Sequence, residues 1–259
     1  MPSNYWSKDW FLDFSSRLSK NVEADPDLLG LILVGSASDT SRADEWSDHD
    51  FFLVAKEGFA EKFRQDLSWL PYSDQIAWSP RETAHGLKVV YGFGHVLEFA
   101  VFNDTELELA KVNAATVAVD KARLLERVDR MREVSRPTDS IDWDAELEIL
   151  LTHILIGVGR HRRGETLIAG EQIRSYLLGN LLGLVSQWVQ PVAGTSHTED
   201  NLNRFRRFET RYPAIAARIQ AALQNDAETA AKRLLELVEE LHPEVSTKSS
   251  VVRKRLGWT

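Results

Sequence analysis

LILVGS at residues 31–36 and DHDFFLV at residues 48–54, with eleven residues between them, decide the fold of this chain. Each apolar run predicts a β-strand, and the small pair Gly35-Ser36 predicts a turn after the first one. Side chains alternate across a strand, so Asp48 and Asp50 are expected on the same face. Two carboxylates on one face repel each other unless a cation lies between them, and hard Mg²⁺ is the obvious candidate.

Gly35 and Ser36 suit the phosphate side of the same site. Gly35 has no Cβ and lets the backbone approach a ligand closely. Ser36 offers a hydroxyl and an N–H, and a short helix that begins here would favour a phosphate. Taken singly, each feature is more typical of an ordinary turn. Taken with the two carboxylates, the pair predicts a nucleoside triphosphate held by its phosphates.

A third carboxylate follows in the run VLEFAVF at 96–102, which predicts another strand. Glu98 is the only charged residue in this run. An ionised Glu among apolar residues needs a metal, a partner or a raised pKa. We therefore expect Glu98 to bind metal, to act as a general base, or both; the alternative is an edge-strand Glu that faces water.

The combined pattern resembles the nucleotidyltransferase superfamily of the DNA polymerase beta type, whose signature is an apolar strand, Gly-Ser or Gly-Gly, a loop and Asp-x-Asp. Within it, the chain resembles the aminoglycoside and lincosamide antibiotic nucleotidyltransferases. The resemblance implies catalytic, metal-binding carboxylates at Asp48, Asp50 and Glu98, with Gly35 and Ser36 at the nucleotide. It further implies Mg²⁺, ATP as the default donor, and transfer of a nucleoside monophosphate to a hydroxyl with release of pyrophosphate.

The chain divides near Arg136, where the predicted pattern changes from mixed to helical. We expect an α+β fold with a catalytic domain at 1–136, in which helices flank a mixed sheet, and an all-α helical bundle at 137–245. The resemblance places the acceptor side of a cleft on this bundle. The remaining residues, 246–259, hold four cations and predict a solvated, mobile basic tail.

Hydrophobic periodicity predicts the individual elements. In the first part we expect helices near 5–20, 59–68 and 120–133, strands near 29–34, 49–55, 75–78, 87–91, 96–102 and 116–119, and a hairpin turn at 91–94. In the second part we expect helices at 144–162, 166–189, 214–223 and 228–241.

Composition bounds the partners. The 259 residues carry a net charge of −8 and no cysteine. Proteins that follow a nucleic acid backbone usually have a basic face, so the acidic balance disfavours that partner. The absence of cysteine excludes disulfides and thiolate zinc sites and fits a cytoplasmic location. No apolar run approaches 18 residues and the start has no signal-peptide core, so we expect no membrane segment.

Three classes of function remain open. The first is nucleotidylation of a small-molecule hydroxyl, such as that of an aminoglycoside or lincosamide antibiotic, which would confer antibiotic resistance. The second is nucleotidylation of a protein or tRNA end in a toxin–antitoxin-type system. The third is a non-catalytic nucleotide-binding module. The helical half fused to the catalytic half favours the first class, and the presence of all three acids disfavours the third. A homodimer through an apolar bundle face stays open.

Four further features are ambiguous in sequence. His49 should point away from the two Asp residues and is interpreted as a packed or hydrogen-bonded histidine. Arg42 and Lys88 could reach triphosphate oxygens, but sequence does not place them. The cluster Arg160–Glu165 suits a helix C-terminus, with Gly164 as the residue after the cap. The rival interpretation sends one Arg, or Glu165, toward the acceptor.

Overall fold

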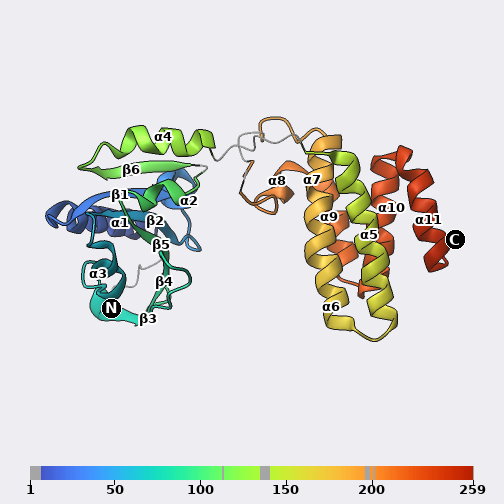
Figure 1. Ribbon diagram of the computed structural model, residues 1–259, viewed down its shortest axis with the longest axis horizontal. Helices are drawn as coiled ribbons and strands as arrows, with labels where there is room; N and C mark the ends of the chain where they lie inside the picture. The colour runs from blue at the N-terminus through green and yellow to red at the C-terminus, as the bar shows by residue number, and fades with distance from the viewer. Residues whose placement is uncertain (1–6, 113, 135–140, 196–198, 201, 259) are drawn as a thin grey trace. The chain divides into compact units, whose positions relative to one another are not determined.

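The computed structural model describes residues 7–112, 114–134, 141–195, 199–200 and 202–258. The chain forms two compact units, Met1–Arg136 and Pro137–Thr259 (Figure 1). Arg136 and Pro137, where the sequence predicts a boundary, lie outside the described residues. The first unit holds the sheet and the second is helical, so the predicted α+β fold class is confirmed. Among the described residues, no helix combines the length and apolar content that a membrane crossing requires.

A six-stranded mixed sheet forms the centre of the first unit, with strand order β3-β4-β5-β2-β1-β6. Its strands are β1 (Leu28–Val34), β2 (His49–Ala55), β3 (Ile76–Trp78), β4 (Gly86–Tyr91), β5 (Val96–Asn103) and β6 (Ala115–Asp120). β2 pairs with β5 in parallel, while the other neighbours are antiparallel. The two strands that carry the predicted carboxylates, β2 and β5, are therefore direct neighbours at the centre of the sheet.

One face of the sheet packs against α1 (Lys8–Ala24) and α3 (Ala60–Gln65). α1 begins after Ser7, whose side chain caps it by accepting a hydrogen bond from the Trp10 N–H at 3.2 Å. Its apolar side chains recur every three to four residues and are buried in the core with alternate residues of β2 and β5. The buried set on α1 is Phe11, Phe14, Leu18 and Val22. The helix predicted at 5–20 is thus present, shifted toward the C-terminus.

The opposite face is covered at one end by α4 (Leu124–Val134), which runs alongside β6 (Figure 1). Gly30 of β1 permits close contact there, because a Cβ on it would lie 2.2 Å from Cδ1 of Leu124. The helix begins later than the predicted residue 120. Asp120 ends β6, and its carboxylate accepts the Leu124 N–H at 2.8 Å. The rest of this face is where Asp50 and Glu98 lie.

Shorter turns complete the first unit. They are α2 (Gly35–Ser38) and the 3₁₀ turns Thr40–Arg42, Ser73–Gln75 and Glu106–Leu109. α2 follows β1 directly, so Gly35 and Ser36 form the first turn after that strand.

The second unit is a helical bundle around one hydrophobic core. Its helices are α5 (Trp143–Arg162), α6 (Thr166–Glu171), α7 (Leu178–Trp188), α8 (Phe208–Arg211), α9 (Pro213–Leu223), α10 (Ala227–Leu241) and α11 (Ser246–Leu256), with a 3₁₀ turn at Pro243–Val245. The predicted helix at 166–189 is interrupted by a π-helical turn at Gln172–Leu177. That turn is a local change of hydrogen bonding that apolar spacing does not reveal.

The prediction of a solvated, mobile tail at 246–259 is wrong. Ser246–Leu256 form α11, which packs on the bundle with Val252 2% exposed, and Trp258 just after the helix is 8% exposed. Arg253 forms an ion pair with Glu239 of α10. The tail was interpreted by its charge, but its apolar residues at helical spacing bury one side of the helix.

The cluster Arg160–Glu165 ends α5 as the structural interpretation predicts. Gly164 has a φ of +83°, the left-handed conformation that suits the residue after a helix cap. Arg162 donates to Glu228 of α10 at 3.0 Å through Nε, and Arg163 forms an ion pair with Glu165 at 2.9 Å. These contacts account for the cluster within the bundle.

Candidate active site

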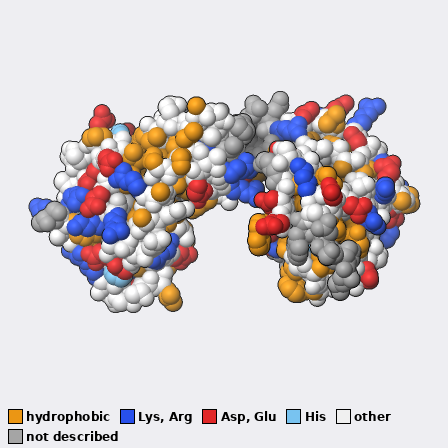
Figure 2. All heavy atoms as spheres, turned by 180° about the vertical axis from the view of Figure 1, so that it is seen from behind, with side chains coloured by type: hydrophobic (Ala, Val, Ile, Leu, Met, Phe, Trp, Pro, Cys, Tyr) orange, Lys and Arg blue, Asp and Glu red, His pale blue; other side chains and the backbone are white. Residues whose placement is uncertain are grey.

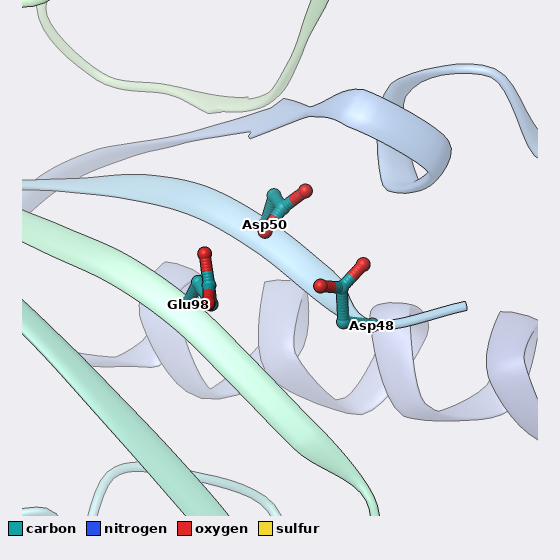
Figure 3. Close-up of side chains that lie close together, drawn as sticks. All are labelled: Asp48, Asp50 and Glu98. Carbon is teal, nitrogen blue, oxygen red and sulfur yellow. The ribbon is translucent and has the colours of Figure 1, made fainter. Parts of the chain in front are cut away.

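Asp48, Asp50 and Glu98 converge on one patch of the sheet (Figure 3). Asp48 immediately precedes β2, and Asp50 lies two residues further along the same face. Glu98 of β5 lies directly opposite Asp50 in the parallel pairing. One carboxylate oxygen from each residue lies within 4.8 Å of the others. Figure 3 shows the three side chains rising from the same side of the two strands, with a helix on the other side.

The turn after β1 is fitted against these carboxylates. Gly35 has a φ of +58°, and its α-carbon faces the Asp50 carboxylate. The Ser36 hydroxyl donates to the backbone carbonyl of Asp48 at 3.1 Å. The hydroxyl expected at the phosphate therefore holds the start of β2 in place. Gly35-Ser36 and Asp48–Asp50 form one continuous local structure although eleven residues separate them in sequence.

Lys88 is the cation that sequence could not place. It lies on β4 directly opposite Glu98 in the antiparallel pairing. Its Nζ is 3.0 Å from Oε1 of Glu98 and 3.1 Å from Oε1 of Glu82. Hydrogen bonds to Glu98, and then to Glu82, raise the pKa of the Lys88 ammonium. A row of charged residues thus crosses three neighbouring strands: Asp50, Glu98 and Lys88. The side chain of Arg42, the other suggested phosphate contact, lies outside the described residues.

The site is open to solvent on the Glu98 side. The Glu98 side chain is 46% exposed, whereas Asp48 and Asp50 are half-buried. A carboxylate this accessible can contact a bound molecule without rearrangement of the core. Glu98 is also not the edge-strand residue considered above, because β5 lies between β4 and β2.

His49 points to the opposite face, as predicted, and is fully buried. Its Nε2 lies 2.8 Å from the Ser15 hydroxyl of α1, and its Nδ1 lies 2.8 Å from Nε2 of His95. Burial lowers the pKa of His49 well below its usual value, with the neighbouring His95 ring as a lesser cause, and lowers the pKa of His95 to about 4. The two neutral rings therefore tie the start of β2 to α1 and to the residue that precedes β5.

A pocket of about 520 Å³ opens beside Asp48 within the first unit. It is lined by the segment before β2 and the segment before β5, namely Glu45, Trp46, Ser47, Asp48, Gly94, His95 and Val96. The Trp46 side chain is 86% exposed, which is unusual for the largest apolar residue. Sequence analysis did not single out Trp46 or His95. The position of Trp46, two residues before the Asp-x-Asp motif, was the sequence signal that could have identified it.

Charges of both signs are interspersed over each unit on the face drawn in Figure 2. Lys and Arg side chains alternate there with Asp and Glu side chains, in keeping with the net charge of −8. Over the residues that the structure describes, this face therefore lacks the uniformly basic surface that typically binds a nucleic acid backbone.

No protein-family model matches the chain, and no curated protein matches it in sequence. Among solved structures, it is similar to an aminoglycoside 6-adenyltransferase from Bacillus subtilis, with 14% identity, coverage of 98% of this chain and 92% of that chain, and a TM-score of 0.31. It is also similar to a STING-associated CdnE c-di-GMP synthase from Capnocytophaga granulosa, with 10% identity, coverage of 93% and 82%, and a TM-score of 0.31.

Proposed function

We propose that this protein is a Mg²⁺-dependent nucleotidyltransferase that moves a nucleoside monophosphate from a triphosphate to a hydroxyl of a small molecule. The observation that carries the proposal is the convergence of Asp48, Asp50 and Glu98 within 4.8 Å. These carboxylates come from neighbouring strands and lie beside a Gly-Ser turn. Phosphoryl transfer needs such a site because positioning and charge stabilisation supply most of its rate.

The donor set fits a hard divalent cation. All three ligands are carboxylates, and Mg²⁺ prefers carboxylate oxygens combined with water and substrate phosphate oxygens. Asp48, Asp50 and Glu98 would hold one such ion, or two. A bound Mg²⁺ would neutralise negative charge on the triphosphate and on the reacting phosphorus.

The residues of the chain accept a proton and position the carboxylates. Glu98 accepts the proton of the acceptor hydroxyl through a carboxylate oxygen. The acceptor oxygen forms a bond to the α-phosphorus of the triphosphate, and the bond from that phosphorus to the bridging oxygen breaks, so that pyrophosphate leaves. Gly35 keeps the turn after β1 close to Asp50, and Ser36 keeps Asp48 in register with that turn.

The pocket beside Asp48 supplies binding space in this unit. Its lining residues include the exposed Trp46 and the acidic residues Glu45 and Asp48. An aromatic face beside carboxylates suits a flat or cationic group of a substrate.

The acceptor class is tested first with aminoglycosides and lincosamides, because the sequence resembles enzymes that modify them. Pyrophosphate release is measured with Mg²⁺ and each of the four nucleoside triphosphates against a panel of these compounds. Asp50→Asn serves as the blank, and Asp13→Asn serves as the matched control. Asp13 lies on α1, where its partner is Arg17 at 2.6 Å.

Release that depends on one compound, vanishes in Asp50→Asn and persists in Asp13→Asn identifies donor and acceptor together. Silence with every small molecule, combined with label transfer to a protein or to a tRNA end, moves the acceptor to a macromolecule. Release that survives Asp50→Asn contradicts the proposed site.

A further inference from the structure

We propose that Lys88 is an internal counter-cation of Glu98, and that a divalent cation binds at the three carboxylates by displacing the Lys88 ammonium from Glu98 while that ammonium keeps Glu82. This displacement rests on the cation site of the proposed function and adds the Lys88 ammonium to it as a competing cation.

Oxygens of the three carboxylates lie within 4.8 Å of one another, so a positive charge beside any of them reduces their mutual repulsion. Lys88 supplies one positive charge from the next strand, with Nζ 3.0 Å from Oε1 of Glu98. The pairing of β4 with β5 fixes this contact, because Lys88 of β4 lies directly opposite Glu98 of β5.

The contact between Lys88 and Glu98 also opposes the binding of a divalent cation at Glu98. A carboxylate can accept several bonds, but an ammonium and a divalent ion on one carboxylate repel each other at a few ångströms. Binding of the ion therefore favours a position of Nζ further from Glu98. The Lys88 side chain is 37% exposed, so it can change rotamer without disturbing the core.

Glu82 is the partner that Lys88 keeps when it leaves Glu98. Its Oε1 lies 3.1 Å from Nζ of Lys88. Glu82 lies in the segment before β4, where its N–H donates to the carbonyl of Gly86 at 2.9 Å. This backbone contact keeps Glu82 close to the strand that carries Lys88. Lys88 can therefore leave Glu98 and keep an ionic partner, which lowers the cost of admitting the ion.

Binding of Mn²⁺ to the full-length chain without nucleotide tests the proposal, with free Mn²⁺ measured by electron paramagnetic resonance. Lys88→Met removes the charge and keeps the length of the side chain. It should tighten binding by about fivefold or more, because the competing cation is gone. Glu82→Gln should weaken binding by about threefold, because Lys88 then loses the ion pair with Glu82 and stays at Glu98.

The double variant Lys88→Met/Glu82→Gln distinguishes displacement of Lys88 from a direct electrostatic effect of Glu82 on the bound ion. If Glu82 acts through Lys88, Glu82→Gln has little effect in the Lys88→Met background. An equal weakening in both backgrounds overturns the displacement. Weaker binding in Lys88→Met than in the wild type also overturns it, and would make Lys88 a residue that positions Glu98 for the ion.

Lys62→Met is the matched control. Lys62 lies on α3, which packs on the opposite face of the sheet, and its partner is Asp27 at 3.2 Å. This variant should bind Mn²⁺ as the wild type does. If the wild type binds Mn²⁺, Asp50→Asn does not, and Lys88→Met binds it more weakly than the wild type, the displacement is refuted and the proposed function stands. If the wild type shows no Mn²⁺ binding that depends on Asp50, both are refuted.

Discussion

Gly35 lies against the Asp50 side chain at a position that favours glycine. A Cβ placed on Gly35 would lie 2.6 Å from Oδ2 of Asp50, closer than real Cβ atoms approach other atoms. The backbone of Gly35 also has a φ of +58°, which side-chain-bearing residues rarely adopt. Two independent constraints therefore favour glycine where the first strand turns toward the carboxylates.

Gly35→Ala should consequently impair both stability and activity. The strained backbone should lower the free energy of unfolding by about 1–3 kcal/mol, and displacement of Asp50 should lower turnover more than Ser36→Ala does. Urea denaturation and pyrophosphate release measure the two effects. Gly92→Ala is the control in the same unit, because a Cβ there meets Gln75 at an ordinary 3.6 Å. Normal turnover in Gly35→Ala would show that the contact has no role in the site.

Glu98→Gln should separate binding from chemistry. The amide cannot take a proton from the acceptor hydroxyl, so turnover should fall by about 10²-fold or more. Binding of ATP, measured by calorimetry, should change little. Glu108→Gln removes an exposed carboxylate from the same unit and should leave turnover intact. Normal turnover in Glu98→Gln would assign a structural role to this residue and require another base.

Trp46→Ala should weaken the binding of one substrate and leave the fold intact. Its side chain is 86% exposed, so the free energy of unfolding should stay within about 0.5 kcal/mol of the wild-type value. Loss of an aromatic contact of about 1–2 kcal/mol should raise KM for that substrate by about five- to thirtyfold. Trp78→Ala, at a residue 60% exposed on β3, is the matched control. Unchanged KM values for donor and acceptor would remove the pocket from the site.

The buried pair His49 and His95 should make stability sensitive to mild acid. An unfolded histidine binds a proton below about pH 6.5, whereas the folded chain holds the pKa of His95 at about 4. Below pH 6.5 the unfolded chain therefore binds more protons, and the free energy of unfolding falls as the pH falls. Each histidine contributes up to about 1.4 kcal/mol per pH unit.

Denaturation in urea between pH 7 and about pH 5 measures this slope, since most carboxylates titrate below that range. His95→Gln should make the slope shallower. A free energy of unfolding that stays constant over this range would contradict the buried, neutral state of the pair.

Local patterns in the sequence were sufficient to predict the first two carboxylates. Alternation along one strand places Asp48 and Asp50 on the same face, and apolar neighbours predict that strand. Glu98 could be predicted only as a candidate, because its contact with Asp50 depends on which strands are neighbours in the sheet. The parallel pairing of β2 with β5 brings the two residues together.

Contacts that depend on register were beyond the reach of the sequence. Lys88 of β4 contacts Glu98 of β5, and His95, which precedes β5, contacts His49 of β2. The basic helix α11 was misinterpreted for a different reason. Four cations dominate its sequence, but Val252, Leu256 and Trp258 are buried against the bundle, and tertiary packing decides its structure. The π-helical turn at Gln172–Leu177 depends on local backbone hydrogen bonding, which apolar spacing does not encode.

Transfer of radioactive label from ATP to the acceptor tests the central claim most directly. The reaction is run with ATP labelled at the α-phosphate and, separately, at the γ-phosphate, with Mg²⁺ and the acceptor that supports pyrophosphate release. The proposed function predicts that only α-label reaches the acceptor, and that Asp50→Asn abolishes the transfer. Transfer of γ-label, or transfer of α-label that persists in Asp50→Asn, would contradict nucleotidyl transfer at these three carboxylates.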